Sequence, residues 1–112
     1  MLIVSSNSAG ERAVHHHRTA IDSAKQAGAH RILYTSHMGA SPTALFPPMR
    51  DHAATEAALQ EAGVAFIALR NGFYAESARL FLGNASKTGE LVAPEDGPVA
   101  WTSQADLAEV TA

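Results

Sequence analysis

Residues suited to ligand binding gather in the segment Asn71 to Ser77, directly after the apolar run Val64 to Leu69. Ligands of parallel α/β sheets bind just beyond the carboxyl ends of the strands, where this segment would lie. Gly72 lets the backbone approach a ligand closely, and the rings of Phe73 and Tyr74 offer a flat apolar wall. We therefore expect a ligand-binding loop at this strand end.

Polar side chains also follow the two earlier apolar runs of the chain. Ser5, Ser6 and Asn7 come after the first run, and Ser36 and His37 stand at the end of the second. In a parallel sheet these positions belong to the same edge as the loop after the third run. Taken alone, the residues after the first run fit the cap of a following helix better than a binding loop.

Two histidine patterns invite a metal-binding or catalytic interpretation. His15, His16 and His17 are consecutive, and consecutive helical residues point about 100° apart, so they cannot converge on one metal ion. His52 and Glu56 are four residues apart and would share a helix face, as an acid–base pair or as a surface ion pair. We favour the surface ion pair and predict no metal site.

Two further residues are assigned structural roles. Arg70 ends the third apolar run, where it could contact a phosphate or form an ion pair from sheet to helix, and we favour the ion pair. Tyr34 stands in the middle of the second run and is expected in the core.

Strands and helices alternate in the pattern that would position these residues. Ser8 is a plausible cap of the first helix, and Gly28 and Gly63 stand where left-handed C-terminal residues are expected. Pro47 and Pro48 can begin a helix but cannot lie inside one. The expected strands are 2–4, 32–36 and 64–69, and the expected helices cover 13–27, 49–62 and 75–82.

This alternation predicts an α/β fold, a partial Rossmann-type parallel sheet with three strands alternating with helices. The N-terminal glycine-rich βαβ unit is missing, because the sequence contains neither G-x-G-x-x-G nor G-x-x-x-x-G-K-[ST]. After Asn84 we expect short extended pieces at 90–92 and 99–101, and then a helix begun by a capping box at Ser103 to Asp106. A three-stranded sheet has two open edges, so we expect an internal fragment of a larger domain that could form a homodimer.

Composition narrows the class of protein. The chain has 112 residues, of which 46% are hydrophobic, and this suits one small domain with a packed core. The net charge of −3 argues against nucleic acid as a partner, and the absence of cysteine excludes disulfides and thiolate chemistry. No apolar run approaches the roughly 20 residues of a membrane span, and the amino terminus lacks a signal-peptide pattern. We expect a cytoplasmic protein without a membrane partner.

Four segments carry a family resemblance that runs over essentially the whole chain. They are Tyr34-Thr35-Ser36, His52-Ala53-Ala54-Thr55-Glu56, Leu69-Arg70-Asn71-Gly72-Phe73-Tyr74 and Trp101-Thr102-Ser103-Gln104-Ala105-Asp106. The chain resembles the NmrA-like group of atypical short-chain dehydrogenases/reductases, and within it the NAD(P)H:quinone oxidoreductase branch. Members of that family are longer, so residues 1–112 would be the central to C-terminal part of a single NAD(P)-binding Rossmann-like domain.

The resemblance implies NADP or NAD as the cofactor. In the family, two loops at strand ends contact the dinucleotide, and they map onto the loops after the first and third expected strands. An arginine that can reach a phosphate in the family is Gln104 here, so the resemblance does not carry that contact over. Ser36, His37 and Tyr74 are implied for the substrate side. The residues implied for the dinucleotide are Ser5, Ser6, Asn7, Gly72, Phe73, Tyr74, Ala75, Glu76 and Ser77.

The implied reaction is hydride transfer from NAD(P)H to a quinone-like small molecule. Typical short-chain dehydrogenases use a Tyr-x-x-x-Lys pair on the helix that here contains His52 to Glu56, and neither residue is present there. Quinone reduction does not demand such a pair, because the hydroquinone anion can take its proton from water, so no catalytic residue is assigned. A non-catalytic NAD(P)-sensing regulator of the NmrA-like type fits the same residues. The choice between NADH and NADPH stays open.

Overall fold

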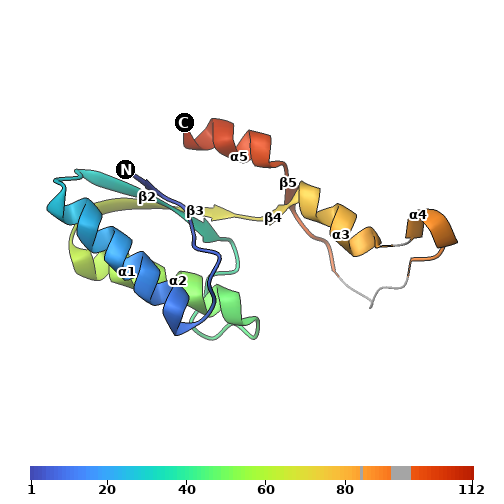
Figure 1. Cartoon of the computed structure of the whole chain (residues 1–112), viewed down its shortest axis with the longest axis horizontal. Coiled ribbons are helices and arrows are strands. Elements are labelled where there is room, and N and C mark those ends of the chain that lie inside the picture. The colour runs from blue at the N-terminus through green and yellow to red at the C-terminus, as the bar shows by residue number, and fades with distance from the viewer. Residues whose placement is uncertain (84, 92–96) are drawn as a thin grey trace. The chain divides into compact units, whose positions relative to one another are not determined.

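The computed structural model describes residues 1–83, 85–91 and 97–112 of the chain. These residues form two compact units, Met1–Asn71 and Gly72–Ala112 (Figure 1). The first unit contains a parallel sheet and two long helices, and the second contains shorter elements.

The first unit confirms the predicted fold class, because three parallel strands alternate with helices along the chain. The strands lie in the order β1-β2-β3, with Leu33 opposite both Leu2 and Ile67. Both connecting helices cover the same face of the sheet (Figure 1). The elements are β1 (Leu2–Ile3), α1 (Glu11–Gln26), β2 (Arg31–His37), α2 (Pro47–Ala62) and β3 (Ala65–Asn71).

The core of this unit lies between the sheet and the helices. Alternate residues of β2 are buried on the helix-facing side, which is the pattern of a strand with one covered face. Tyr34 is 0% exposed, as expected of a core residue. Each large apolar side chain buried in this layer contributes about 1.5–3 kcal/mol. The core cluster comprises Ile3, Ile21, Ala24, Ile32, Tyr34, Ala58 and Leu59.

The C-terminal ends of the two long helices follow the predictions, and their starts differ from them. Gly28 and Gly63 both have positive φ, 78° and 69°, in the left-handed region that favours glycine after a helix. Pro47 begins α2, two residues earlier than predicted, because proline suits the first helical turn. Ser8 is not the cap of α1. The N-cap is Gly10, whose N–H donates to Asp51 Oδ2 at 2.8 Å, so a carboxylate from α2 satisfies this donor.

The second unit contains two short strands, one near its start and one near its end, that pair in parallel. Phe73 lies opposite Trp101, and their ring centroids are 5.9 Å apart. The segment predicted as one helix over 75–82 is a 3-10 turn followed by an α-helix. The predicted capping box is confirmed at its N-cap, because the Ser103 hydroxyl accepts from the Asp106 N–H at 3.1 Å. The elements are β4 (Phe73–Tyr74), η1 (Ala75–Ser77), α3 (Ala78–Leu82), α4 (Ala85–Thr88), β5 (Trp101–Thr102) and α5 (Gln104–Thr111).

Two expectations remain, the extended pieces after Asn84 and the lack of a membrane-spanning segment. Of the two expected extended pieces, 90–92 includes Val92, which lies outside the described residues, and 99–101 runs into β5. None of the helices in the described part of the chain is long and apolar enough to cross a membrane.

Candidate functional site

A polar cavity of about 120 Å³ lies beside the carboxyl end of β1 in the first unit. Its lining comes from the loop after β1, from α1, from β2 and from the first turns of α2, so distant parts of the sequence build it. The lining residues are Ser5, Ser6, Ser8, Ala13, His17, Tyr34, Pro48, Asp51 and His52.

Side chains from neighbouring elements hold the backbone of the loop after β1. The Ser5 N–H donates to Thr35 Oγ1 at 2.8 Å, and the Ser6 N–H donates to His17 Nε2 at 2.8 Å. Within the loop, the Ser8 N–H donates to Ser6 Oγ at 3.3 Å. Because these N–H groups are already engaged, the loop offers a ligand mainly its side-chain hydroxyls and carbonyl oxygens.

The His17 ring is fixed in one neutral tautomer by its partners. Its Nε2 accepts from Ser6, so Nδ1 carries the hydrogen and donates to Thr55 Oγ1 at 2.8 Å. The Thr55 hydroxyl in turn donates to the Asp51 carbonyl at 2.9 Å. His17 is only 3% exposed, and burial, together with the positive charge of nearby His52, lowers its pKa. The chain of bonds therefore ties the loop after β1 to helix α2.

Tyr34 and His52 form a second pair at the cavity wall. The Tyr34 hydroxyl lies 2.9 Å from His52 Nδ1. Burial raises the pKa of Tyr34, so this phenol stays protonated. Burial and the positive charge of His37 lower the pKa of His52, and their effect outweighs the opposite influence of Asp51 and Glu56.

A third group, formed by Ser36, Glu56 and Arg70, joins the sheet to helix α2. Arg70 donates from Nε to Glu56 Oε1 at 3.0 Å and from Nη2 to Oε2 at 2.6 Å, which confirms the predicted ion pair from sheet to helix. The Ser36 hydroxyl donates to the same Oε1 at 2.6 Å. Burial disfavours ionisation of Glu56, but the hydrogen bonds from Arg70 and Ser36 outweigh it and lower its pKa. The expected surface ion pair of His52 with Glu56 is wrong, because each side chain has another partner.

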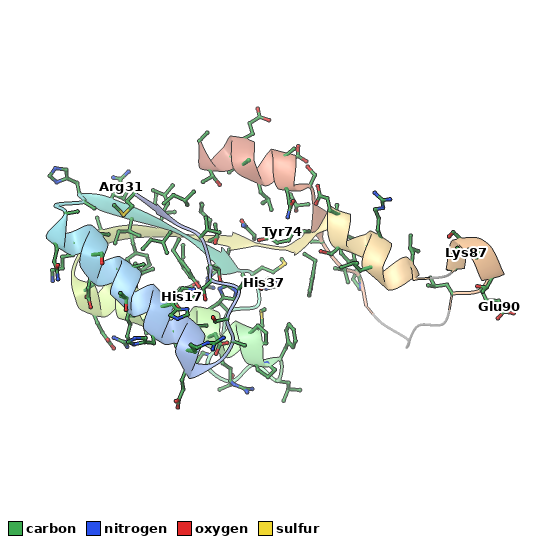
Figure 2. All side chains as sticks on the ribbon, in the orientation of Figure 1. His17, Arg31, His37, Tyr74, Lys87 and Glu90 are labelled. Atoms are coloured by element: carbon green, nitrogen blue, oxygen red, sulfur yellow. The ribbon has the colours of Figure 1, made fainter. Side chains whose placement is uncertain are left out.

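The structure brings together only part of the residues assigned from the sequence. Ser5 and Ser6 line the cavity, and Asn7 stands in the same loop. Ser36 is 4% exposed and directed to Glu56, and it is not among the residues that line the cavity. His37 Nδ1 accepts from the Gly39 N–H at 3.0 Å, and its ring centroid lies 6.2 Å from that of His52. Figure 2 shows His17 on α1 and His37 at the end of β2.

The other assigned residues, Gly72 to Ser77, belong to the second unit. Tyr74 is followed by the 3-10 turn that contains Ala75, Glu76 and Ser77. Both carboxylate oxygens of Glu76 accept from the Gln104 N–H, at 3.1 and 3.2 Å. The backbone N–H of Gln104, the first residue of α5, is thus paired with the Glu76 carboxylate.

Sequence reasoning missed the roles of His17, Asp51 and the Tyr34–His52 pair. One signal was available, because His17 lies on the apolar face of α1, four residues from both Ala13 and Ile21. A polar residue on an apolar face is usually buried with a partner. Among residues 1–83, 85–91 and 97–112, no group of three or more His, Asp or Glu side chains is arranged to hold a metal ion.

Known proteins match the chain at the level of both sequence and fold, although no family model matches it. Quinone oxidoreductase 2 of Escherichia coli is 36% identical over 115 residues, which cover 100% of this chain and 39% of that protein. An NmrA-like family domain-containing oxidoreductase of Aspergillus flavus, flvB, is 36% identical over 104 residues, 91% of this chain and 34% of that protein. The chain is a homologue of the NmrA-like oxidoreductases. It spans between a third and two fifths of the length of these relatives.

Solved structures of two reductases share the fold of this chain. The crystal structure of the NADPH-dependent quinone oxidoreductase QOR2 of Escherichia coli, complexed with NADPH, superposes with a TM-score of 0.63 at 36% identity. The match covers 76% of this chain and 28% of that one. The triphenylmethane reductase of Citrobacter sp. complexed with NADP(H) has a TM-score of 0.64 at 23% identity, over 79% of this chain and 30% of that one, and shows the likeness of fold.

Proposed function

We propose that residues 1–112 are the central to C-terminal part of a single NAD(P)-binding Rossmann-like domain. The full-length protein would then be an NAD(P)H-dependent oxidoreductase that reduces a quinone-like acceptor. The observation that carries this proposal is the 36% identity to quinone oxidoreductase 2 over the whole chain. The parallel sheet, with a polar cavity at the carboxyl end of β1, supports it, because ligands bind at that edge.

Two loops of the chain would bind the dinucleotide. The loop after β1 suits an uncharged, hydroxyl-rich part of the ligand, because Ser5 and Ser6 present hydroxyls while their N–H groups are engaged. In the second unit, Gly72 to Ser77 would supply the other contacts, with Phe73 and Tyr74 as the apolar wall. When bound, the reduced nicotinamide supplies the hydride, and the protein positions it against the acceptor and excludes competing reactions.

Turnover by the full-length protein tests the proposal. Purified protein with NADPH and benzoquinone should consume NADPH, measured by its absorbance, well above the rate in buffer. No turnover above buffer would reject the enzymatic function. Binding of NADPH without turnover would instead favour a non-catalytic NAD(P)-sensing regulator, so a cofactor titration should accompany the kinetics.

A further inference from the structure

The ring of His52 lines the cavity, and one of its two nitrogens is bonded to Tyr34. Nδ1 bonds to the Tyr34 hydroxyl at 2.9 Å. In the part of the chain that the structure describes, no residue forms a hydrogen bond with Nε2. A tyrosine hydroxyl can donate to a neutral imidazole and accept from a protonated one. When Tyr34 donates to the neutral ring, and also when the ring is protonated, the Nε2 atom carries a hydrogen. The ring that bears it lines the cavity.

The other cavity groups are less suited to give a proton. Both nitrogens of His17 are engaged, with Ser6 and Thr55. Tyr34 is 0% exposed, and burial raises its pKa. Asp51 accepts from the Gly10 N–H at the start of α1. Serine hydroxyls are far weaker acids than a protonated imidazole. His52 is therefore the acid of this cavity, and it lines the same space as the loop Ser5 to Ser8.

We propose that His52 gives the reduced acceptor its proton and that Tyr34 is the positioning residue of His52. This inference rests on the proposed function. The acceptor gains a hydrogen with both electrons from the C4–H bond of the reduced nicotinamide, which is thereby oxidised. The reduced acceptor carries one negative charge on an oxygen. The N–H bond at Nε2 of protonated His52 then breaks and an O–H bond forms, so His52 becomes neutral and regains a proton from water.

The charges around His52 set the pH dependence of this step. His37 from β2 and His17 from α1 face it as potential cations, while Asp51 and Glu56 from its own helix face it as anions. The net result of burial and these charges is a pKa below the ordinary 6.5. The proton-donating form therefore becomes more abundant as the pH falls through the range below 6.5, and turnover should rise in the same direction.

Kinetics of the variant His52→Gln in the full-length protein test the proposal. Glutamine can still bond to Tyr34 but cannot act as an acid. We expect kcat for benzoquinone to fall about 100-fold, the usual range for loss of a general acid, and the rise in kcat at low pH to disappear. NADPH affinity should be unchanged, as measured by fluorescence titration. The matched control is His30→Gln, because His30 is exposed and lies at the other end of β2.

Two further measurements separate a proton donor from a merely structural residue. Tyr34→Phe should weaken turnover less than His52→Gln and keep a low-pH rise, because His52 remains. In the wild-type protein with ¹⁵N-labelled histidine, the NMR spectrum should show the His52 hydrogen on Nε2 and a His52 pKa below the ordinary 6.5. This readout does not depend on activity.

Each outcome decides between the two hypotheses. A wild-type protein that does not reduce benzoquinone rejects the proposed function, and the role of His52 with it. A wild-type protein that does, with His52→Gln retaining the same kcat and pH profile, rejects only the role of His52. A hydrogen on Nδ1 in place of Nε2 also rejects it. Loss of kcat with intact NADPH affinity and the expected tautomer supports it.

Discussion

Removal of the His17 ring should loosen the loop after β1 at Ser6, while the bond of Ser5 to Thr35 remains. In His17→Ala the Ser6 N–H loses its acceptor and Thr55 Oγ1 loses its donor. The Thr55 hydroxyl keeps its bond to the Asp51 carbonyl, so α2 itself stays intact. The prediction therefore concerns a defined link between a loop and two helices.

The size of the effect follows from burial. His17 is 3% exposed and Thr55 is 0% exposed, so water does not readily replace the lost partners. A buried donor left unsatisfied costs about 1–3 kcal/mol. The space left by the ring adds about 2 kcal/mol. The free energy of unfolding should fall by about 3–5 kcal/mol, a large part of the roughly 5–15 kcal/mol of a typical domain.

Urea unfolding, followed by circular dichroism, measures this change, and amide hydrogen exchange at Ser6 locates it. His17→Gln should recover part of the loss, because its amide offers both an acceptor and a donor. The control His16→Ala removes a neighbouring exposed histidine and should change stability by no more than about 0.5 kcal/mol. Equal stability of His17→Ala and His16→Ala, with Ser6 exchange unchanged, would refute the proposed link.

Three further predictions concern pH, the sheet-to-helix ion pair and cofactor binding. The pKa values of His17, His37 and His52 lie below the ordinary 6.5, so the unfolded chain binds more protons below that pH. The free energy of unfolding should therefore fall as the pH drops below about 6.5, by at most about 1.4 kcal/mol per pH unit for each histidine, and a flat urea midpoint between pH 7 and 5 would contradict this. Arg70→Met should raise the pKa of Glu56, which the pH titration of the Glu56 side-chain ¹³C signal measures. The control is Arg18→Met, because Arg18 pairs with the exposed Glu61, and this variant should leave the Glu56 titration unchanged. The 112-residue chain alone should bind NADPH weakly or not at all in isothermal titration, because it lacks a glycine-rich phosphate turn, and micromolar binding would overturn this expectation.

The order of elements and several of their ends could be predicted from local sequence. Gly28 and Gly63 mark helix ends because glycine adopts positive φ at little cost. Pro47 marks a helix start because the proline ring fixes φ near the value of a helix. Such rules depend on a residue and its close neighbours in the chain. The same holds for Ser103, whose hydroxyl bonds to a residue three positions on.

The contacts that build the candidate site depend on the tertiary structure. Ser8 satisfies the local rule for a helix cap, yet the carboxylate that serves α1 comes from Asp51, brought there by the packing of α2 on α1. His52 and Glu56 are spaced as a pair, but His52 bonds to Tyr34 and Glu56 to Arg70.

The sequence by itself determined that this is a parallel α/β chain with polar residues at its strand ends, because strand and helix patterns are short-range. Which of those polar groups meet was decided only by the tertiary structure. The bond between His17 and Thr55 joins residues 38 positions apart, and no local pattern specifies a partner at such a distance. Because α1 and α2 pack on one face of the sheet, His17 Nδ1 and Thr55 Oγ1 lie 2.8 Å apart.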